Sequence, residues 1–204
     1  MNGERAGARG PEQRAGWMDE LESRLVRRIA PAASGEDPAS PAMRRAGVLI
    51  PLFVRDGQLW ILFTRRTDTV EHHRGQISFP GGAHEDGDED LLATALRETQ
   101  EEIGVAPDDV RVLGALSPLP TITNFYVEPY VAAIPQPYVF EPAEAEIAEI
   151  IEVPVAALLD PAVREEKTLA GRPEVILFYN YGDHVIWGAI ARMLSELLEA
   201  LGRS

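Results

Sequence analysis

The sequence contains no cysteine and a single lysine, and both shortages narrow the chemistry open to it. Without cysteine there are no disulfides, no thiolate nucleophile and no cysteine-ligated metal. The lack of cysteine fits a reducing compartment. Because Lys167 is the only lysine, a positively charged site must be built mainly from arginine, whose planar fork suits phosphates and carboxylates.

Long apolar runs are also missing. Ala46–Val54 is among the longest, and it is too short to cross a bilayer as a helix. Residues 1–16 lack the apolar core of a secretory signal peptide, and Glu4 and Glu12 argue against a transit peptide. We therefore expect a cytoplasmic protein that does not enter a membrane.

Positive charge is scarce relative to negative charge. The chain has 19 lysine and arginine residues and 33 aspartate and glutamate residues, which gives a net charge of −14. Such a field repels nucleic acid and anionic membranes, so we expect neither as a partner. A phosphate-bearing ligand would then have to be held by a local basic cluster or by a metal ion.

The chain divides into an arm and one domain. Residues 1–42 carry one amphipathic segment, Trp17–Ala30, and a linker rich in Pro, Ser and Ala. Residues 43–204 carry the remaining elements and are long enough for one core. The predicted strands are 46–54, 58–66, 110–116, 126–134, 147–153 and 174–181, and the predicted helices are 90–103, 154–159 and 186–201. Because strands and helices mix without strict alternation, we expect a mixed α+β sandwich rather than a doubly wound parallel sheet.

One segment gathers acidic residues directly after a Pro-Gly-Gly turn: FPGGAHEDGDEDLLATALRETQEEIGV, residues 79–105. Glu98, Glu101 and Glu102 have the i, i+3, i+4 spacing that places side chains on one face of a helix. Three carboxylates so placed repel one another unless a cation lies among them, and hard oxygen ligands select Mg²⁺, Mn²⁺ or Ca²⁺. The pattern favours metal-assisted attack on a phosphate chain.

Two other interpretations of this segment were weighed. A solvated acidic helix face, with Arg97 paired to its neighbours, is the commoner origin of a generic acidic cluster. An EF-hand loop beginning at Asp86 is excluded, because Leu91 stands where that loop needs glycine and Arg97 where it needs glutamate. No His-Glu-x-x-His sequence is present, so a zinc site of that type is not expected.

The segment resembles the signature of the Nudix hydrolases, which hydrolyse a nucleoside diphosphate linked to another group. That signature runs Gly, five residues, Glu, seven residues, then Arg-Glu-apolar-any-Glu-Glu-any-Gly-apolar. The positions that match are Gly82, Arg97, Glu98, Glu101, Glu102, Gly104 and Val105. Thr99 takes the apolar slot. The loop after Gly82 is one residue longer than the general pattern, so either Asp88 or Glu89 fills the first acidic slot. The resemblance implies the Nudix fold, an α+β fold with a mixed β-sheet sandwiched between α-helices, for residues 43–204.

The stretch upstream is similar to the motif of the coenzyme A pyrophosphatase branch of this family. It reads LFTRRTDTVEHHRGQISFPGG, residues 62–82. The matching residues are Leu62, Thr64, Arg66, Gly75, Phe79, Pro80, Gly81 and Gly82. Phe63, Thr67 and Glu71 depart from the motif. Glu71 matters most, because it replaces an arginine and reverses the charge where a phosphorylated substrate is expected.

The resemblance implies roles for the residues that match. Glu98 and Glu102 would be the main ligands of Mg²⁺ or Mn²⁺, and Glu101 a further ligand or a group that orients water. The carbonyl oxygen of Gly81 is a candidate extra ligand. Arg97 would orient the carboxylates by ion pairing.

Two more sets of residues are candidates for the reaction. A general base must deprotonate the attacking water, and Glu146 is favoured because a similar acid often precedes the late strand in this superfamily. A solvated charge on a Glu-rich loop is an equally good account of Glu146. A basic cluster that precedes the signature is expected to bind substrate phosphates: Arg65, Arg66, His72 and Arg74.

Together these features predict a Mg²⁺- or Mn²⁺-dependent pyrophosphatase that acts on a small-molecule nucleoside diphosphate derivative. The best substrate is coenzyme A or acyl-CoA, which would yield 3′,5′-ADP and 4′-phosphopantetheine. ADP-ribose, NADH and nucleoside triphosphates remain alternatives, since a complete signature says little about the leaving group. A non-catalytic Nudix-fold ligand sensor is the alternative from another class. A homodimer that uses the N-terminal helix and a helix that caps its own domain both stay open.

Overall fold

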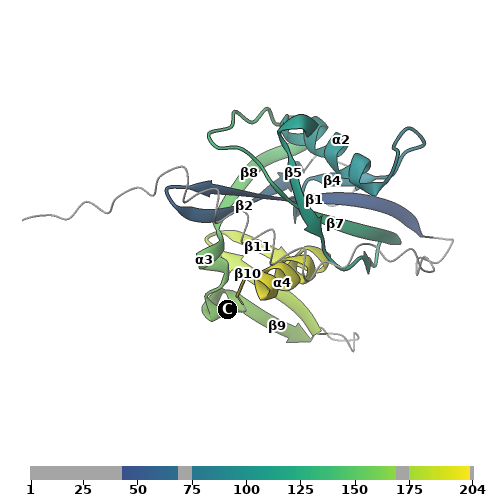
Figure 1. The fold of residues 1–204 in the computed structure, drawn as a ribbon. Coiled ribbons are helices and arrows are strands. Elements are labelled where there is room, and N and C mark those ends of the chain that lie inside the picture. The colour runs from purple at the N-terminus through teal and green to yellow at the C-terminus, as the bar shows by residue number, and fades with distance from the viewer. Residues whose placement is uncertain (1–42, 69–74, 169–174, 203–204) are drawn as a thin grey trace, which may run out of the picture.

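The computed structural model describes residues 43–68, 75–168 and 175–202. The predicted N-terminal helix over 17–30 lies outside these residues, and so do Glu71, His72 and Arg74. The described part is an α+β fold built on one large mixed sheet, one small sheet and three helices (Figure 1).

The large sheet has eight strands. They are β1 (Arg44–Arg55), β2 (Gln58–Arg66), β3 (Ile77–Ser78), β4 (Gly81–Ala83), β5 (Arg111–Ala115), β6 (Leu119–Pro120), β7 (Phe125–Ala133) and β8 (Ile147–Pro154). The main path runs β3-β2-β1-β7-β5, while β4 pairs with β1, β6 with β7 and β8 with β2. β1 and β7 are parallel, and the other pairs are antiparallel. The predicted mixed sheet is therefore confirmed.

β1 and β2 form the hairpin that the turn signal Arg55-Asp56-Gly57 indicates. Arg55 pairs with Gln58 across the turn. The two residues between them, Asp56 and Gly57, have positive φ angles of 52° and 75°. A two-residue turn with positive φ at both positions matches the right-handed twist of the flanking strands, and Asp-Gly is a favoured sequence for it.

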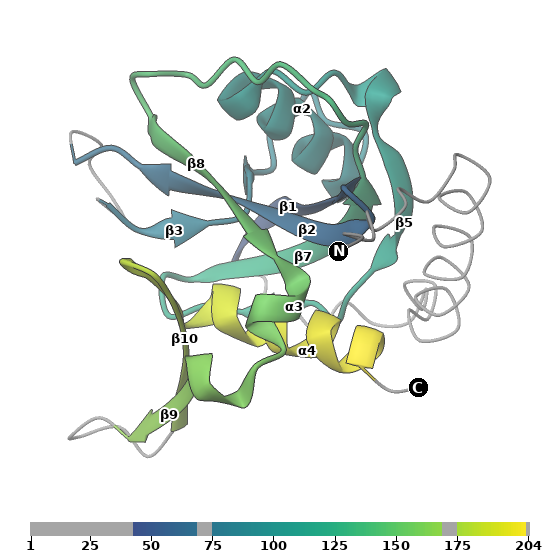
Figure 2. The ribbon, with the colours of Figure 1, turned by 90° about the vertical axis from the view of Figure 1, so that its left-hand side faces the viewer.

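Both faces of the large sheet are covered. Alternate residues of β1, such as Ile50 and Leu52, join Leu197 of α4 (Ala189–Gly202) in the largest apolar core. Leu49, which points the other way, packs with Ala95 of α2 (Leu91–Ile103). Figures 1 and 2 show the result, with α2 above the sheet and α4 below it. The buried run in β1 has no polar alternation because helices lie on both of its sides.

The small sheet lies on the α4 side, in the order β11-β10-β9. Its strands are β9 (Arg164–Thr168), β10 (Val175–Tyr181) and β11 (His184–Trp187). The predicted helix over 186–201 therefore began too early. Ile186 pairs with Tyr179 in the sheet, and Gly188 has a φ of 69° before α4 begins at Ala189. The apolar spacing continues through Ile186, but strand pairing with β10 overrides it.

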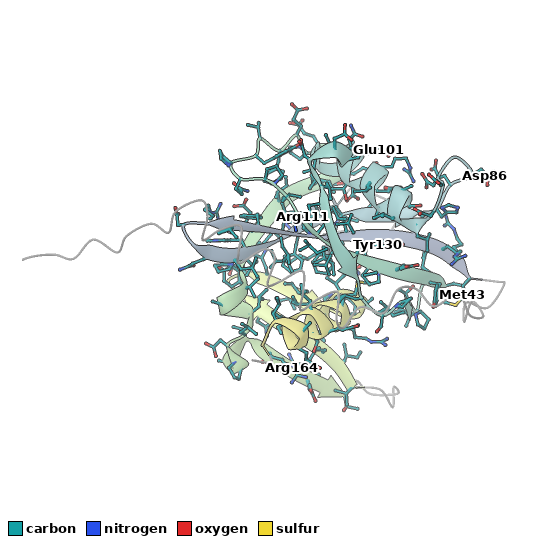
Figure 3. The ribbon with its side chains drawn as sticks, in the orientation of Figure 1. Met43, Asp86, Glu101, Arg111, Tyr130 and Arg164 are labelled. Atoms are coloured by element: carbon teal, nitrogen blue, oxygen red, sulfur yellow. The ribbon has the colours of Figure 1, made fainter. Side chains whose placement is uncertain are left out.

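Three short helical turns complete the described elements: α3 (Val155–Leu158), η1 (Pro107–Asp109) and η2 (Pro161–Val163). The predicted short helix over 154–159 corresponds to α3. Figure 3 shows that the labelled acidic residues Asp86 and Glu101 lie on the α2 side, whereas Arg164 lies on the α4 side, at the start of β9 in the small sheet. Within the described ranges, the helices are too short or too polar to cross a membrane.

Candidate active site

The acidic segment forms α2, whose two ends are set by local sequence. Asp90 caps the helix, its side chain accepting a hydrogen bond of 2.8 Å from the N–H of Ala93. Gly104 ends it with a left-handed φ of 76°, and its N–H donates to the carbonyl of Gln100. The first turn lies directly on β1, because a Cβ on Gly47 would collide with the carbonyl oxygen of Leu91. The predicted helix over 90–103 is confirmed.

Two glycines of β4 bring main chain against the helix carboxylates. A Cβ on Gly81 would collide with the backbone of β1, and Gly81 has a φ of 148°. A Cβ on Gly82 would overlap the carboxylate of Glu98. The N–H of Gly81 donates to Glu102 Oε2 at 3.3 Å. The Pro-Gly-Gly turn thus permits a close approach that a side chain would prevent.

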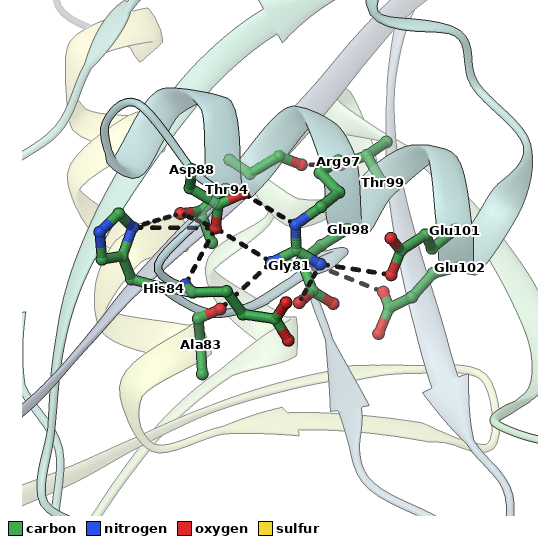
Figure 4. Close-up of polar contacts among 12 residues, drawn as sticks. Gly81, Ala83, His84, Asp88, Thr94, Arg97, Glu98, Thr99, Glu101 and Glu102 are labelled. Atoms are coloured by element: carbon green, nitrogen blue, oxygen red, sulfur yellow. Dashed lines mark hydrogen bonds and ion pairs between the residues drawn. The ribbon is translucent and has the colours of Figure 1, made fainter.

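Arg97 is the centre of the polar network on α2 (Figure 4). Its Nε and Nη2 donate to the two oxygens of Asp88 at 2.9 and 3.1 Å. Its Nη1 donates to Glu98 at 2.9 Å and to Glu101 at 3.3 Å, and Nη2 also reaches the carbonyl of Ala83. One guanidinium therefore orients two carboxylates of the acidic cluster and ties the helix to β4.

Asp88, rather than Glu89, is the acid that pairs with Arg97. The Asp88 side chain is 6% exposed, whereas Glu89 is exposed to solvent. The hydrogen bonds from Arg97 hold the pKa of Asp88 far below its usual range and outweigh its burial, and the same contact raises the pKa of Arg97. Of the two acids that could fill the first acidic slot of the signature, Asp88 is therefore the one that contacts Arg97.

Two further polar residues fix Asp88 from the other side, and the sequence analysis did not single them out. Thr94 Oγ1 donates to Asp88 Oδ2 at 2.8 Å, and His84 Nδ1 lies 3.0 Å from the same hydroxyl. Both appear beside Asp88 in Figure 4. No signal in the sequence separates them from ordinary loop and helix residues, because their role depends on how the loop folds back onto α2.

Glu102 is a buried carboxyl group whose ionised form is disfavoured. Its side chain is 5% exposed, and burial raises its pKa to about 8. The neighbouring charges of Glu98 and Glu146 raise this pKa further, while Arg66 and the Gly81 N–H oppose them. Burial also raises the pKa of Glu98, against the opposing effect of Arg97. Three carboxylates from α2 and the loop before β8 therefore lie close enough to affect one another.

Arg66 joins two of these carboxylates. Its Nη1 lies 3.4 Å from Glu102 Oε1, and its Nη2 donates to Glu146 Oε2 at 3.1 Å. The loop that carries Glu146 is attached to the end of α2, since the N–H of Ala143 donates to the carbonyl of Glu102. The Thr67 N–H in turn donates to the carbonyl of Glu146. Residues far apart in sequence are thus gathered at one end of α2.

Arg65 is not brought to this cluster. It lies on the opposite face of β2, where its Nε donates to Glu149 of β8 at 2.9 Å. His184 of β11 approaches the same carboxylate at 3.8 Å. Successive residues of a strand point to opposite faces, so only one of the two adjacent arginines can face α2. His72 and Arg74, the other predicted phosphate ligands, lie outside the described residues.

The donor chemistry at this end of α2 suits a hard divalent cation. Within the described ranges, three or more acidic or histidine side chains do not already converge as a metal cluster. However, Glu98 and Glu102 offer carboxylate oxygens. The raised pKa of each shows that its surroundings do not fully compensate the ionised form. A cation among such oxygens would favour their ionised forms.

Comparisons with known proteins agree with this arrangement. The family model of the NUDIX domain matches residues 43–171. A protein named uncharacterized Nudix hydrolase NudL, from Cronobacter sakazakii, is 36% identical over 161 residues, which cover 78% of this chain and 83% of that protein. The protein of the same name from Citrobacter koseri is 33% identical over 196 residues, covering 91% and 95%.

Among solved structures, a MutT/nudix family protein from Enterococcus faecalis is similar in fold, with a TM-score of 0.52. It is 15% identical in sequence, and the match covers 91% of this chain and 73% of that one. The family model and the two NudL proteins carry the assignment by sequence, and this structure supports the fold. The chain belongs to the Nudix hydrolase family.

Proposed function

We propose that this chain is a Mg²⁺- or Mn²⁺-dependent pyrophosphohydrolase whose substrate is coenzyme A or an acyl-CoA. The observation that carries the metal-dependent chemistry is Glu102, a buried carboxyl group whose pKa rises to about 8 through burial and the charges of Glu98 and Glu146. A folded protein keeps such a repulsive group where function requires it. A sensor that only bound a ligand would have no need of it.

The placement of these residues supports the roles that we propose for them. Glu98 and Glu102 would hold the metal, and Glu101, which is largely exposed, would hold a further ion or orient water. The Gly81 carbonyl is the candidate main-chain ligand. When bound, a divalent cation activates water and neutralises charge on the diphosphate. Arg97 keeps Glu98 and Glu101 oriented through its hydrogen bonds.

Glu146 is the proposed general base. It lies outside α2 and is joined to Glu102 through Arg66, and its side chain is 54% exposed, so water has access to it. Arg66 Nη2 donates a hydrogen bond to its Oε2, which fixes the position of the side chain beside the cluster. The loop attachment at Ala143 holds it beside Glu102.

The substrate assignment rests on the motif at residues 62–82 and on Arg66. This residue matches the first arginine of the coenzyme A motif, and of the pair Arg65 and Arg66 it is the one that faces the carboxylates. The reaction would release 3′,5′-ADP and 4′-phosphopantetheine or its acyl derivative. Water attacks one phosphorus of the P–O–P linkage and the bond from that phosphorus to the bridging oxygen breaks, so each product carries one of the two phosphate groups.

The test is product analysis by mass spectrometry. The purified protein and Mg²⁺ would be incubated separately with coenzyme A, acetyl-CoA, ADP-ribose, NADH and nucleoside triphosphates. We expect 3′,5′-ADP from the coenzyme A compounds faster than any product from the others. Faster cleavage of another compound would keep the hydrolase and overturn the substrate. No turnover of any compound would favour the ligand sensor.

Glu71 supplies a second test of the substrate. If coenzyme A binds as its motif implies, Glu71→Arg restores the missing positive charge and lowers the Michaelis constant for coenzyme A. The matched comparison is the Michaelis constant for ADP-ribose, which lacks the 3′-phosphate. A marked loss of coenzyme A turnover in this variant would contradict the proposed binding mode.

A further inference from the structure

Arg66 occupies an unusual position between two acids of the candidate site. It lies on the same face of β2 as Leu62, which packs with Ile103 of α2. Its guanidinium lies 3.4 Å from Glu102 and 3.1 Å from Glu146. The first of these distances is long for a charge-assisted hydrogen bond. The two carboxylates therefore share one cation.

The same guanidinium has a donor that the carboxylates do not use. Arg66 Nε is buried and has no hydrogen-bond acceptor in the described structure. A buried N–H without an acceptor is costly, so a native site usually supplies one when it is complete. Although Nε itself is buried, 26% of the Arg66 side chain is exposed, so a ligand can reach the guanidinium and draw it into a new position. A phosphate group offers the several acceptor oxygens that an arginine fork can bind.

A divalent cation would compete with Arg66 for the same carboxylate. A metal ligated by Glu102 and a guanidinium on that carboxylate place two positive centres together. Close like charges repel, most strongly where water is scarce. Binding of the metal would therefore weaken the hold of Glu102 on Arg66 and leave the guanidinium available to an anion.

We propose that Arg66 is an exchangeable counter-ion, which neutralises Glu102 and Glu146 until a divalent cation binds and then moves to the diphosphate of the substrate. This inference rests on the proposed metal-dependent hydrolysis and extends it, because it couples the two binding events. Metal binding frees the arginine that binds the nucleotide, so each ligand increases affinity for the other.

The first measurement is the affinity for Mn²⁺ without any nucleotide, by titration calorimetry. Removing the competing cation in Arg66→Gln should tighten Mn²⁺ binding by about three- to tenfold. Arg66→Lys keeps the charge but lacks the fork that spans both carboxylates, so it should tighten binding by roughly twofold. Arg65→Gln is the matched control, since it removes the same charge from the neighbouring residue on the other face, and its Mn²⁺ affinity should stay at the wild-type value.

The second measurement is the affinity of the Mn²⁺-saturated protein for the Mn²⁺ complex of ADP. Arg66→Gln should weaken it by about tenfold or more, because the guanidinium that binds phosphate is gone. Mn²⁺ affinity and nucleotide affinity then change in opposite directions in one variant. Loss of a merely structural arginine would weaken both.

The outcomes separate the inference from the function on which it rests. Unchanged or weaker Mn²⁺ binding by Arg66→Gln, with Mn²⁺ bound by the wild type and lost in Glu102→Gln, overturns the exchange but keeps the metal site. A wild-type affinity in Arg66→Lys with a tighter Arg66→Gln also overturns it, because net charge alone then explains the effect. Equal Mn²⁺ binding by the wild type and Glu102→Gln would instead reject the proposed metal site.

Discussion

The two faces of the large sheet are built from the same strands but have opposite chemistry. On the α4 face, residues such as Ile50, Phe63 and Leu197 form a closed apolar core. On the α2 face, apolar packing around Leu62 and Ile103 gives way to buried charge at Glu102. Apolar burial stabilises the fold in proportion to area, whereas a buried carboxylate reduces stability unless it is neutralised. Apolar packing on the α4 face thus stabilises a fold in which the buried carboxyl group on the α2 face is destabilising.

The neighbouring residues Arg65 and Arg66 show this contrast at its smallest scale. Arg65 forms a cross-strand pair with Glu149, an arrangement of partly exposed ions that contributes little to stability. Arg66 reaches instead into the acidic cluster. The part that each arginine plays therefore depends on the face of the sheet to which it points and on the side chains that it contacts there.

The largest expected effect is on catalysis when the charge on the α2 face is removed. Glu102→Gln keeps the shape of the side chain but loses the anionic ligand, so turnover should fall by roughly a thousandfold. The measurement is steady-state hydrolysis with the fold checked by circular dichroism. Glu152→Gln is the control, since Glu152 pairs with Arg55 elsewhere in the sheet and its loss should leave turnover nearly unchanged. Near wild-type hydrolysis by Glu102→Gln would reject the metal-site assignment.

A substitution on the α4 face should do the reverse. Leu197 is fully buried, so Leu197→Ala should lower the free energy of unfolding by about 2–5 kcal/mol through lost burial and a cavity. Turnover per folded molecule should stay close to the wild-type value at a temperature where the variant remains folded. Urea unfolding and activity on the same samples would check both. A collapse of turnover in fully folded protein would mean that the two faces are not separable.

The stability of the protein should depend on pH through Glu102. Its pKa rises from the ordinary value of 4.5 to about 8 on folding, so between these values the folded state binds more protons than the unfolded state. Stability from this group is therefore fully present below about pH 4.5 and is lost as the pH rises towards 8. With a chelator present, we expect the free energy of unfolding to fall by a few kcal/mol across this range.

Urea titrations at several pH values would measure this dependence. In Glu102→Gln the fall should be much smaller, because the contribution of Glu102 is gone. A fall of the same sign should remain, since the pKa of Glu98 is also raised. Leu197→Ala should give a curve parallel to that of the wild type. An identical dependence of the free energy of unfolding on pH in the wild type and Glu102→Gln would show that burial of the ionised Glu102 does not destabilise the fold.

The smallest expected effect distinguishes two adjacent acids. Asp88→Asn leaves the bidentate contact with Arg97 without its charge and should lower the free energy of unfolding by about 1–3 kcal/mol. Glu89→Gln makes the same chemical change at an exposed position and should stay within about 0.5 kcal/mol of the wild type. Thermal unfolding would measure both. Equal effects of the two substitutions would contradict the assignment of Asp88 to the signature.

Local patterns in the sequence predicted α2 and account for the turn between β1 and β2, whereas the mixed sheet was implied by the family resemblance. The Asp-Gly turn, the apolar spacing of residues 90–103 and Gly104 each act within a few residues, so the sequence was sufficient for them. The start of α4 was wrong because Ile186 has a helical spacing but a strand partner far along the chain. β9 was not predicted, since its residues, REEKT, are all exposed and show no apolar alternation.

The sequence by itself determined the acidic face of α2, because the spacing of Glu98, Glu101 and Glu102 needs nothing beyond helix geometry. Strand alternation turns Arg65 and Arg66 to opposite faces, although the sequence analysis grouped them in one basic cluster. Only the tertiary structure decided that Asp88 pairs with Arg97 and that Arg66 faces the carboxylates. These contacts depend on how a loop folds and how sheet and helix pack, and such long-range arrangements are not encoded in the spacing of neighbouring residues.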